Sequence, residues 1–258
     1  MNKIVLDKSF LRGESSSKIK ELSKNNTFLM PFSLLYELVK ETPKERVKLF
    51  RKFQKGTPYL LLPTFHKLFQ YETENNRPID MPSSYTQERD YSLHEQLCDE
   101  NFHLSQEQEK AIIQQKKDKD TLLKFFFPLI EEYINQKQYK KQEELEKSIV
   151  FNQEKIYKEY IRLQEFYNKT VLDKSRFNSN WFIYKWLQVL NLFAIDTAYR
   201  YDSLNSIQSS PNAREKLTHD MWDMEYLVFA VSEKSFATKE KKLIKWFDVL
   251  CHDGQLYT

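Results

Sequence analysis

Glycine is nearly absent from this chain, with three residues among 258. Dinucleotide-binding and P-loop motifs need several glycines at fixed spacing, so the sequence excludes both. Cysteine is scarce as well, because Cys98 and Cys251 are the only two and lie far apart, without the close spacing of a zinc site. We therefore expect free thiols and a reducing, cytoplasmic setting.

Long apolar runs and a strong charge imbalance are also missing. No stretch reaches the roughly 18 apolar residues of a membrane-spanning helix, and the first eleven residues lead into a strand-like segment, so we expect no signal peptide and no membrane partner. The net charge is +3, from 40 basic and 37 acidic side chains. Any binding of nucleic acid must therefore come from a local group of basic residues.

Short apolar runs alternate with helical patterns, which indicates an α/β fold. Continuous runs without a polar alternation suit strands of a parallel sheet that is covered on both faces. Such runs lie at 3–6, 27–30, 59–62 and 235–238. Helical patterns lie at 15–23, 32–41, 43–55 and 178–201, and a polar loop over 202–214 leads to a helix that we expect to start at Asp220.

The middle of the chain has a different composition. Residues 83–173 are rich in Gln, Glu and Lys, contain no glycine, and carry apolar residues at helical intervals. We expect two or three long amphipathic helices, folded back as a helical hairpin. The sequence thus predicts a discontinuous α/β domain, 1–82 and 174–258, interrupted by a helical insertion at 83–173 that docks a partner or covers a site.

Acidic residues stand next to several of the predicted strands and helices. Asp7 ends the first strand run, and Glu37 lies between apolar residues of the 32–41 helix. Asp220 and Asp223 open the late helix, and Glu240 follows the last strand run. Asp7 has a plainer interpretation as a solvated turn residue, and Glu37 as a residue on the polar face of its helix. The acids form a site only if the fold brings these ends together.

In their order along the chain, these acids resemble the pattern of the PIN-domain nucleases. Asp7 matches the first position of that pattern in IVLDKSFL, and Glu37 matches the second in PFSLLYEL. Asp223, 15 residues before Thr238 (238 − 223), matches the late Asp better than Asp220 does. Thr238-Lys239-Glu240 takes the place of Thr-x-Asp, with Glu240 in place of the usual Asp.

The resemblance implies a three-layer α/β fold with a central parallel sheet and a site for Mg²⁺ or Mn²⁺. Such ions prefer hard oxygen ligands. The implied catalytic residues are Asp7, Glu37, Asp223 and Glu240, and the implied metal ligands are these four with Asp220 as a helper. The implied contacts to substrate come from Ser9, Thr238, Lys239, Lys241 and Lys242. A basic helix over 44–55 would extend this rim, although lysines on a helix more often only solvate it.

The function that follows is a metal-dependent endoribonuclease that cuts single-stranded or structured RNA, with a toxin or antiviral defence effector as its expected setting. RNA is the favoured substrate over DNA ends or flaps. The insertion would bind a regulatory protein or a second copy of the chain. The alternative is a PIN-like scaffold with weakened catalysis that acts as a protein-interaction module through its helical insertion.

Overall fold

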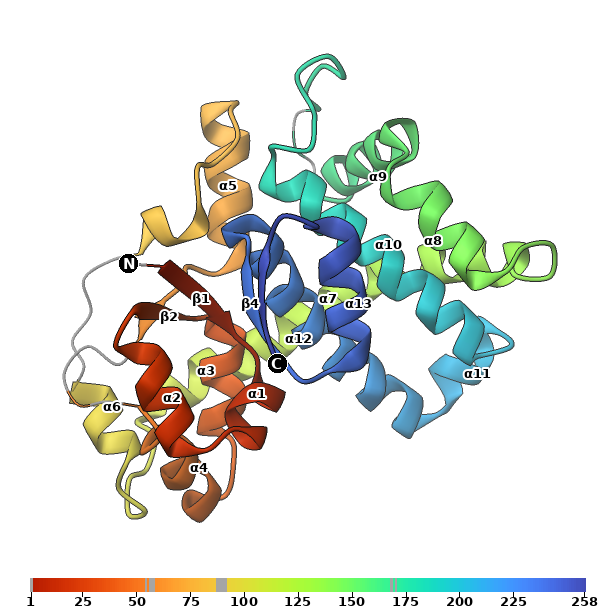
Figure 1. Ribbon diagram of the computed structural model, residues 1–258. Helices are drawn as coiled ribbons and strands as arrows, with labels where there is room; N and C mark the ends of the chain where they lie inside the picture. Colours follow the sequence, from red (N-terminus) through yellow and green to blue (C-terminus); the bar gives the residue numbers. More distant parts are fainter. Residues whose placement is uncertain (1, 54, 56–58, 87–91, 168, 170) are drawn as a thin grey trace. The chain divides into compact units, whose positions relative to one another are not determined.

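The structure is a computed structural model that describes residues 2–53, 55, 59–86, 92–167, 169 and 171–258 (Figure 1). The chain divides into two compact units. The first contains Met1–Leu68, Asp80–Ile112 and Glu225–Thr258, and the second contains Phe69–Ile79 and Ile113–Met224.

A five-stranded sheet forms the centre of the first unit, and all of its strand pairs are parallel. The strands are β1 (Asn2–Leu6), β2 (Asn26–Met30), β3 (Leu60–Leu61), β4 (Ser235–Ala237) and β5 (Gln255–Tyr257). Residues Ile4, Val5 and Leu6 of β1 have no exposed surface, as expected for a central strand covered on both faces. The predicted parallel α/β sheet is confirmed, whereas β5 was not anticipated.

The order of the strands is β3-β2-β1-β4-β5. From β1 the chain builds the sheet outward through β2 to β3, and it later adds β4 and β5 on the other side of β1. The direction of building therefore reverses between β1 and β4. In open α/β sheets ligands bind outside the carboxyl ends of the strands at such a switch point. Asp7 directly follows β1, and Thr238 directly follows β4.

Short helices follow the strands of the first unit. They are α1 (Lys8–Gly13), α2 (Ser16–Ser23), α3 (Phe32–Val39), α4 (Pro43–Phe50), the 3-10 turn η1 (Pro82–Tyr85), α6 (Ser92–Leu97) and α13 (Lys241–Leu250). Side-chain oxygens start two of them, because Ser15 accepts from the N–H of Lys18 and Thr42 from that of Glu45. The expected helices at 15–23 and 32–41 are confirmed, and the basic helix is shorter than expected.

Three helices have residues in both units: α5 (Phe65–Asn75), α7 (Gln106–Gln136) and α12 (Pro211–Glu233). The second unit also contains α8 (Gln142–Val150), α9 (Gln153–Phe166), α10 (Phe182–Arg200) and α11 (Leu204–Ser209). Helix α10 is buried along most of its length and packs against α8 and α9. The predicted buried helix is thus confirmed, and it is the core of the helical unit.

A buried carboxylate fixes the start of α10. Glu72 is 1% exposed and accepts hydrogen bonds from the N–H groups of Phe182 at 2.7 Å and Ile183 at 3.0 Å. It also accepts one from the N–H of Ile79 at 3.0 Å. The first N–H groups of a helix have no partner within the helix. Glu72 supplies that partner from a distant part of the sequence.

The boundaries of the two compact units differ from the domain boundaries expected from the composition. Residues 174–224 belong to the helical unit because α10 provides its core, whereas 83–112 belong to the sheet unit. Among the described residues of the predicted insertion, α7 is long, with 31 residues, while α8 has 9 and α9 has 14. Within the predicted insertion, residues 87–91, 168 and 170 lie outside the described part of the chain.

The late helix begins nine residues earlier than expected, at Pro211, and not at Asp220. Proline is favourable in the first turn of a helix, and the hydroxyl of Ser210 accepts from the N–H of Ala213 at 3.3 Å. The expected loop over 202–214 is therefore wrong in part, since α11 and the start of α12 occupy it. Asp220 and Asp223 lie inside the helix, away from its N-terminal N–H groups.

Both cysteines are free, and Cys251 is buried. Within the described ranges, no helix combines the length and the apolar composition needed to cross a membrane.

Candidate functional site

Asp7 lies at the carboxyl end of β1, where it is the residue before α1. Its main-chain N–H donates to the carbonyl of Ala237 at 3.0 Å, which joins the ends of β1 and β4. Its side chain is buried, with 2% of the residue exposed. Atom Oδ2 accepts hydrogen bonds from the hydroxyl of Ser9 at 2.5 Å and from that of Thr238 at 2.6 Å. The carboxylate is therefore held in one orientation.

Burial raises the pKa of Asp7 above its ordinary value, because a charged carboxylate is poorly solvated in the interior. The hydrogen bonds from Ser9 and Thr238 oppose this effect by stabilising the charged form. The negative charge of Glu240 raises the pKa further. Asp7 and Glu240 are thus close enough to interact electrostatically.

The segment after β4 is tied to the same carboxylate. The Thr238 hydroxyl accepts from the N–H of Glu240 at 3.1 Å, and the Ser9 hydroxyl accepts from the N–H of Lys239 at 2.9 Å. Thr238 is fully buried, whereas Glu240 is exposed at the start of α13. The fold therefore brings together four of the residues singled out in the sequence: Asp7, Ser9, Thr238 and Glu240.

Glu37 is held by two residues that the sequence patterns did not point to. Its side chain is 10% exposed and accepts hydrogen bonds from the hydroxyl of Tyr226 and, at 3.4 Å, from Nζ of Lys8. The same Nζ lies 2.8 Å from Glu41, which also pairs with Arg12 at 2.6 Å. Lys8 directly follows Asp7 in the sequence. This position could have indicated a cation near the acids.

The lysines after Thr238 have different surroundings. Lys239 forms an ion pair with Glu14 at 2.6 Å, and its hydrogen bond, together with its charge, lowers the pKa of that carboxyl. Lys241 is exposed. Nζ of Lys242 lies 5.4 Å from the centre of the Trp246 ring. Because Lys239 pairs with Glu14 and Lys242 lies near Trp246, the exposed Lys241 is the best placed of the three for contact with a ligand.

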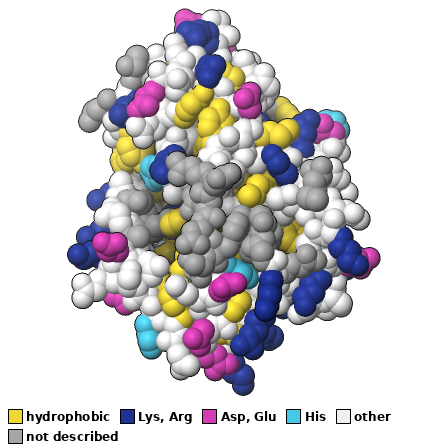
Figure 2. Space-filling model, turned by 90° about the vertical axis from the view of Figure 1, so that its left-hand side faces the viewer, with side chains coloured by type: hydrophobic (Ala, Val, Ile, Leu, Met, Phe, Trp, Pro, Cys, Tyr) yellow, Lys and Arg dark blue, Asp and Glu magenta, His cyan; other side chains and the backbone are white. Residues whose placement is uncertain are grey.

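Two cations of the basic segment 44–55 form hydrogen bonds inside the fold. Arg46 donates to the carbonyls of Asp99 at 2.9 Å and Phe102 at 3.2 Å, and Lys52, just after α4, donates to that of Leu11 at 2.5 Å. Both are buried, so neither can belong to a basic rim. The expectation that the whole segment 44–55 extends the rim is therefore wrong for these two residues and is limited to the exposed lysines of the segment. Figure 2 shows basic side chains interspersed with acidic ones over one face of the molecule.

Asp220 and Asp223 belong to the second unit. Atom Oδ2 of Asp220 lies 2.5 Å from a guanidinium nitrogen of Arg200, which also lies 3.2 Å from Asp196. The side chain of Asp220 is 5% exposed, so this is a buried ion pair within the helical unit. Asp223 is partly buried. The acids that the structure shows together are those of the first unit.

Comparisons with protein-family models, curated proteins and solved structures found no match to this chain. The resemblance to PIN nucleases therefore remains a hypothesis, and the geometry of the site has to support it.

The chemistry of the donors fits a single hard cation. In the part of the chain that the structure describes, no three His, Cys, Asp or Glu side chains form a group that could hold a metal ion. Mg²⁺, however, is often bound through one or two carboxylates, with water and phosphate oxygens as its other ligands. Asp7 and Glu240 provide two such carboxylates at the switch point.

Proposed function

We propose that this protein is a metal-dependent phosphodiesterase, an endoribonuclease that cuts single-stranded or structured RNA with a PIN-like set of acids. The observation that supports the proposal is the position of Asp7. It lies at the switch point of a parallel sheet, bonded to Ser9 and Thr238 and close to Glu240. Buried acids with shifted pKa values at such a place are candidates for catalysis.

Asp7 and Glu240 would hold Mg²⁺ or Mn²⁺. When bound, such an ion supplies a hydroxide at neutral pH and neutralises charge on the phosphate. The hydroxyls of Ser9 and Thr238 orient the Asp7 carboxylate, and Thr238 also fixes the main chain at Glu240. These contacts favour a positioning role for the two hydroxyls over the direct contact with substrate that the sequence suggested.

Glu37 and Lys8 would act on the substrate side of the site. Tyr226 and Lys8 orient the Glu37 carboxylate, which is suited to accept a proton from an attacking water. The side chain of Lys8 is 20% exposed, and with Lys241 it would offer positive charge to a phosphate. Asp223 belongs to the second unit, so its predicted role depends on the resemblance alone.

The test is cleavage of a panel of single-stranded RNA, tRNA, single-stranded DNA and double-stranded DNA, with Mn²⁺, with Mg²⁺ and with EDTA. We expect metal-dependent cutting of RNA, with internal cleavage products. Cutting of DNA but not of RNA would show that the substrate class is DNA instead of RNA. Absence of cutting of any substrate by folded protein would overturn the proposal.

A protein-interaction module remains the second candidate, and two exposed aromatic side chains in the helical unit favour it. Tyr139, before α8, is 80% exposed, and Phe151, after α8, is 70% exposed. Exposed aromatic residues are enriched where proteins bind each other. If catalysis is absent, replacement of both by Ser should abolish binding of a partner while the fold is retained.

A further inference from the structure

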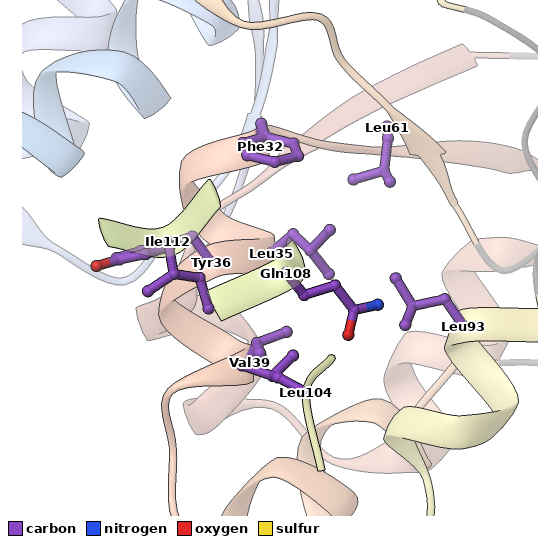
Figure 3. Close-up of a pocket in the computed structure, with 9 residues that line it drawn as sticks. All are labelled: Phe32, Leu35, Tyr36, Val39, Leu61, Leu93, Leu104, Gln108 and Ile112. Carbon is purple, nitrogen blue, oxygen red and sulfur yellow. The ribbon is translucent and has the colours of Figure 1, made fainter. Parts of the chain in front are cut away.

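The sheet unit contains an apolar cavity that has no role in the proposed phosphodiester chemistry (Figure 3). Its volume is about 190 Å³. Helix α3 contributes one side of it, and the end of β3, helix α6 and the segment around the start of α7 contribute the rest. Its lining includes Leu35, Tyr36, Leu93, Gln108 and Ile112.

The size of the cavity limits what it can hold. An apolar cavity of about 150 Å³ lined by aliphatic and aromatic side chains can hold benzene. The present cavity is somewhat larger, so it has room for an apolar group of about six to eight carbon atoms. Leu35 and Tyr36 are 7% and 5% exposed, so the wall formed by α3 is well packed.

Gln108 supplies a polar group to this cavity, and the structure defines which of its atoms is available. Its Oε1 accepts from the N–H of Ser105 at 2.8 Å, while the Ser105 hydroxyl accepts from the N–H of Gln108 at 3.2 Å. This reciprocal pair is a capping box at the start of α7. Because the oxygen must face the Ser105 N–H, the amide nitrogen remains to donate to a ligand. Figure 3 shows the nitrogen pointing toward Leu93.

We propose that this cavity is a binding site for a small neutral organic molecule with an apolar body and one hydrogen-bond acceptor, of the ketone, ester or amide class. The apolar body fills the space between α3 and the start of α7. The acceptor oxygen takes the hydrogen bond from Nε2 of Gln108. This site is independent of the acids after β1 and β4, so it stands whether or not the protein cleaves RNA.

The test compares acetophenone, which has a carbonyl oxygen, with ethylbenzene, which has a similar body without one. Binding is measured by ligand-observed NMR and by isothermal titration calorimetry. We expect the wild type to bind acetophenone at least tenfold more tightly than ethylbenzene. The variant Gln108→Glu keeps the capping oxygen and replaces the amide donor with an acceptor. It should lose most of this preference, while ethylbenzene binds nearly as before.

Two neighbouring residues of α7 give a matched pair of controls. Ile112 lines the cavity, whereas Ile113 does not line it and is 55% exposed. Ile112→Trp should fill the space and abolish binding of both compounds, and Ile113→Trp should leave binding unchanged. The proposal is overturned if the wild type binds neither compound up to its solubility, or if Ile112→Trp binds both as well as the wild type. It is also overturned if the cavity proves to be a contact between copies, seen as self-association that Ile112→Trp removes.

Discussion

The hydroxyl of Thr238 donates a hydrogen bond of 2.6 Å to Oδ2 of Asp7 and so connects the ends of two neighbouring strands, β1 and β4. The same hydroxyl accepts from the N–H of Glu240. One buried side chain therefore links the two acids that we propose as metal ligands.

Replacement of Thr238 by Val should destabilise the sheet unit. The substitution keeps the shape of the side chain but removes a donor to a buried carboxylate and an acceptor for a main-chain N–H, which together cost about 1–3 kcal/mol. Urea denaturation at pH 7 measures this loss. Thr121, which is exposed on α7, provides the control, since Thr121→Val should change stability by less than about 0.5 kcal/mol. Equal effects of the two substitutions would contradict the assigned role of Thr238.

The stability effect of Asp7→Asn should depend on pH. Burial raises the pKa of Asp7 in the folded state above the unfolded value of 3.8, so folding favours the neutral carboxyl. The contribution of Asp7 to stability is full below the unfolded pKa and declines as the pH rises through the folded pKa. Asn stays neutral at every pH. The variant should therefore gain stability relative to wild type between pH 4 and pH 7.

Urea denaturation of both proteins at pH 4, 5.5 and 7 measures this difference. A difference that is constant with pH, or that shifts in favour of wild type as the pH rises, would contradict the account of the buried Asp7 carboxyl.

Asp220→Asn should act on the stability of the helical unit. Asp220 forms a buried ion pair with Arg200, and removal of one partner from such a pair costs about 3 kcal/mol or more. The additional change Arg200→Met should recover part of the loss, because it removes a partly buried charge that keeps only Asp196 as its carboxylate partner. Thermal unfolding of the single and double variants measures both effects. Retained stability with lost RNA cleavage in Asp220→Asn would instead favour the metal-ligand role that the sequence suggested.

Glu72 should titrate near neutral pH. Burial raises its pKa to about 7, against the opposing effect of the N–H groups of Ile183, Phe182 and Ile79. Because the folded pKa is raised, the contribution of Glu72 to stability is full below its unfolded value of 4.5 and declines as the pH rises through 7. The amide NMR signals of Phe182 and Ile183 should shift with a midpoint near pH 7.

The variant Glu72→Gln provides the control for this titration, since its side chain has no proton to lose. The two amide signals should then stay constant between pH 5 and pH 8.5. A wild-type midpoint near 4.5 would show that the start of α10 stabilises the charged carboxylate more than burial disfavours it.

The sequence predicted the parts of the fold that depend on local patterns. The uninterrupted run Ile4-Val5-Leu6 predicts a central parallel strand, and the apolar circumference of α10 predicts a buried helix. β5 was missed because Gln255–Tyr257 has only three residues, which is too short for a recognisable strand pattern. The start of α12 was misplaced because the polar residues after Pro211 resemble a loop, although most of them are compatible with a helix.

The proximity of two acids, Asp7 and Glu240, could be predicted from the sequence, whereas the partners of the acids could not. The positions of Asp7 and Glu240 after strand-like runs indicated that they would meet at one edge of a parallel sheet. The contact of Tyr226 with Glu37 joins residues 189 positions apart in the sequence. The pairing of Asp220 with Arg200 depends on the packing of α12 near the end of α10. Such contacts follow from tertiary packing, which no local pattern in a single sequence encodes.

The most direct test of the central claim is the rate of metal-dependent RNA cleavage by wild type, Asp7→Asn and Glu240→Gln under single-turnover conditions. Glu21→Gln, at an exposed carboxylate on α2, serves as the matched control. The account predicts that Asp7→Asn and Glu240→Gln each lower the rate at least 100-fold, while Glu21→Gln cleaves like wild type and all the variants remain folded. Cleavage by Asp7→Asn at the wild-type rate would contradict it, because the proposed site cannot work without that carboxylate.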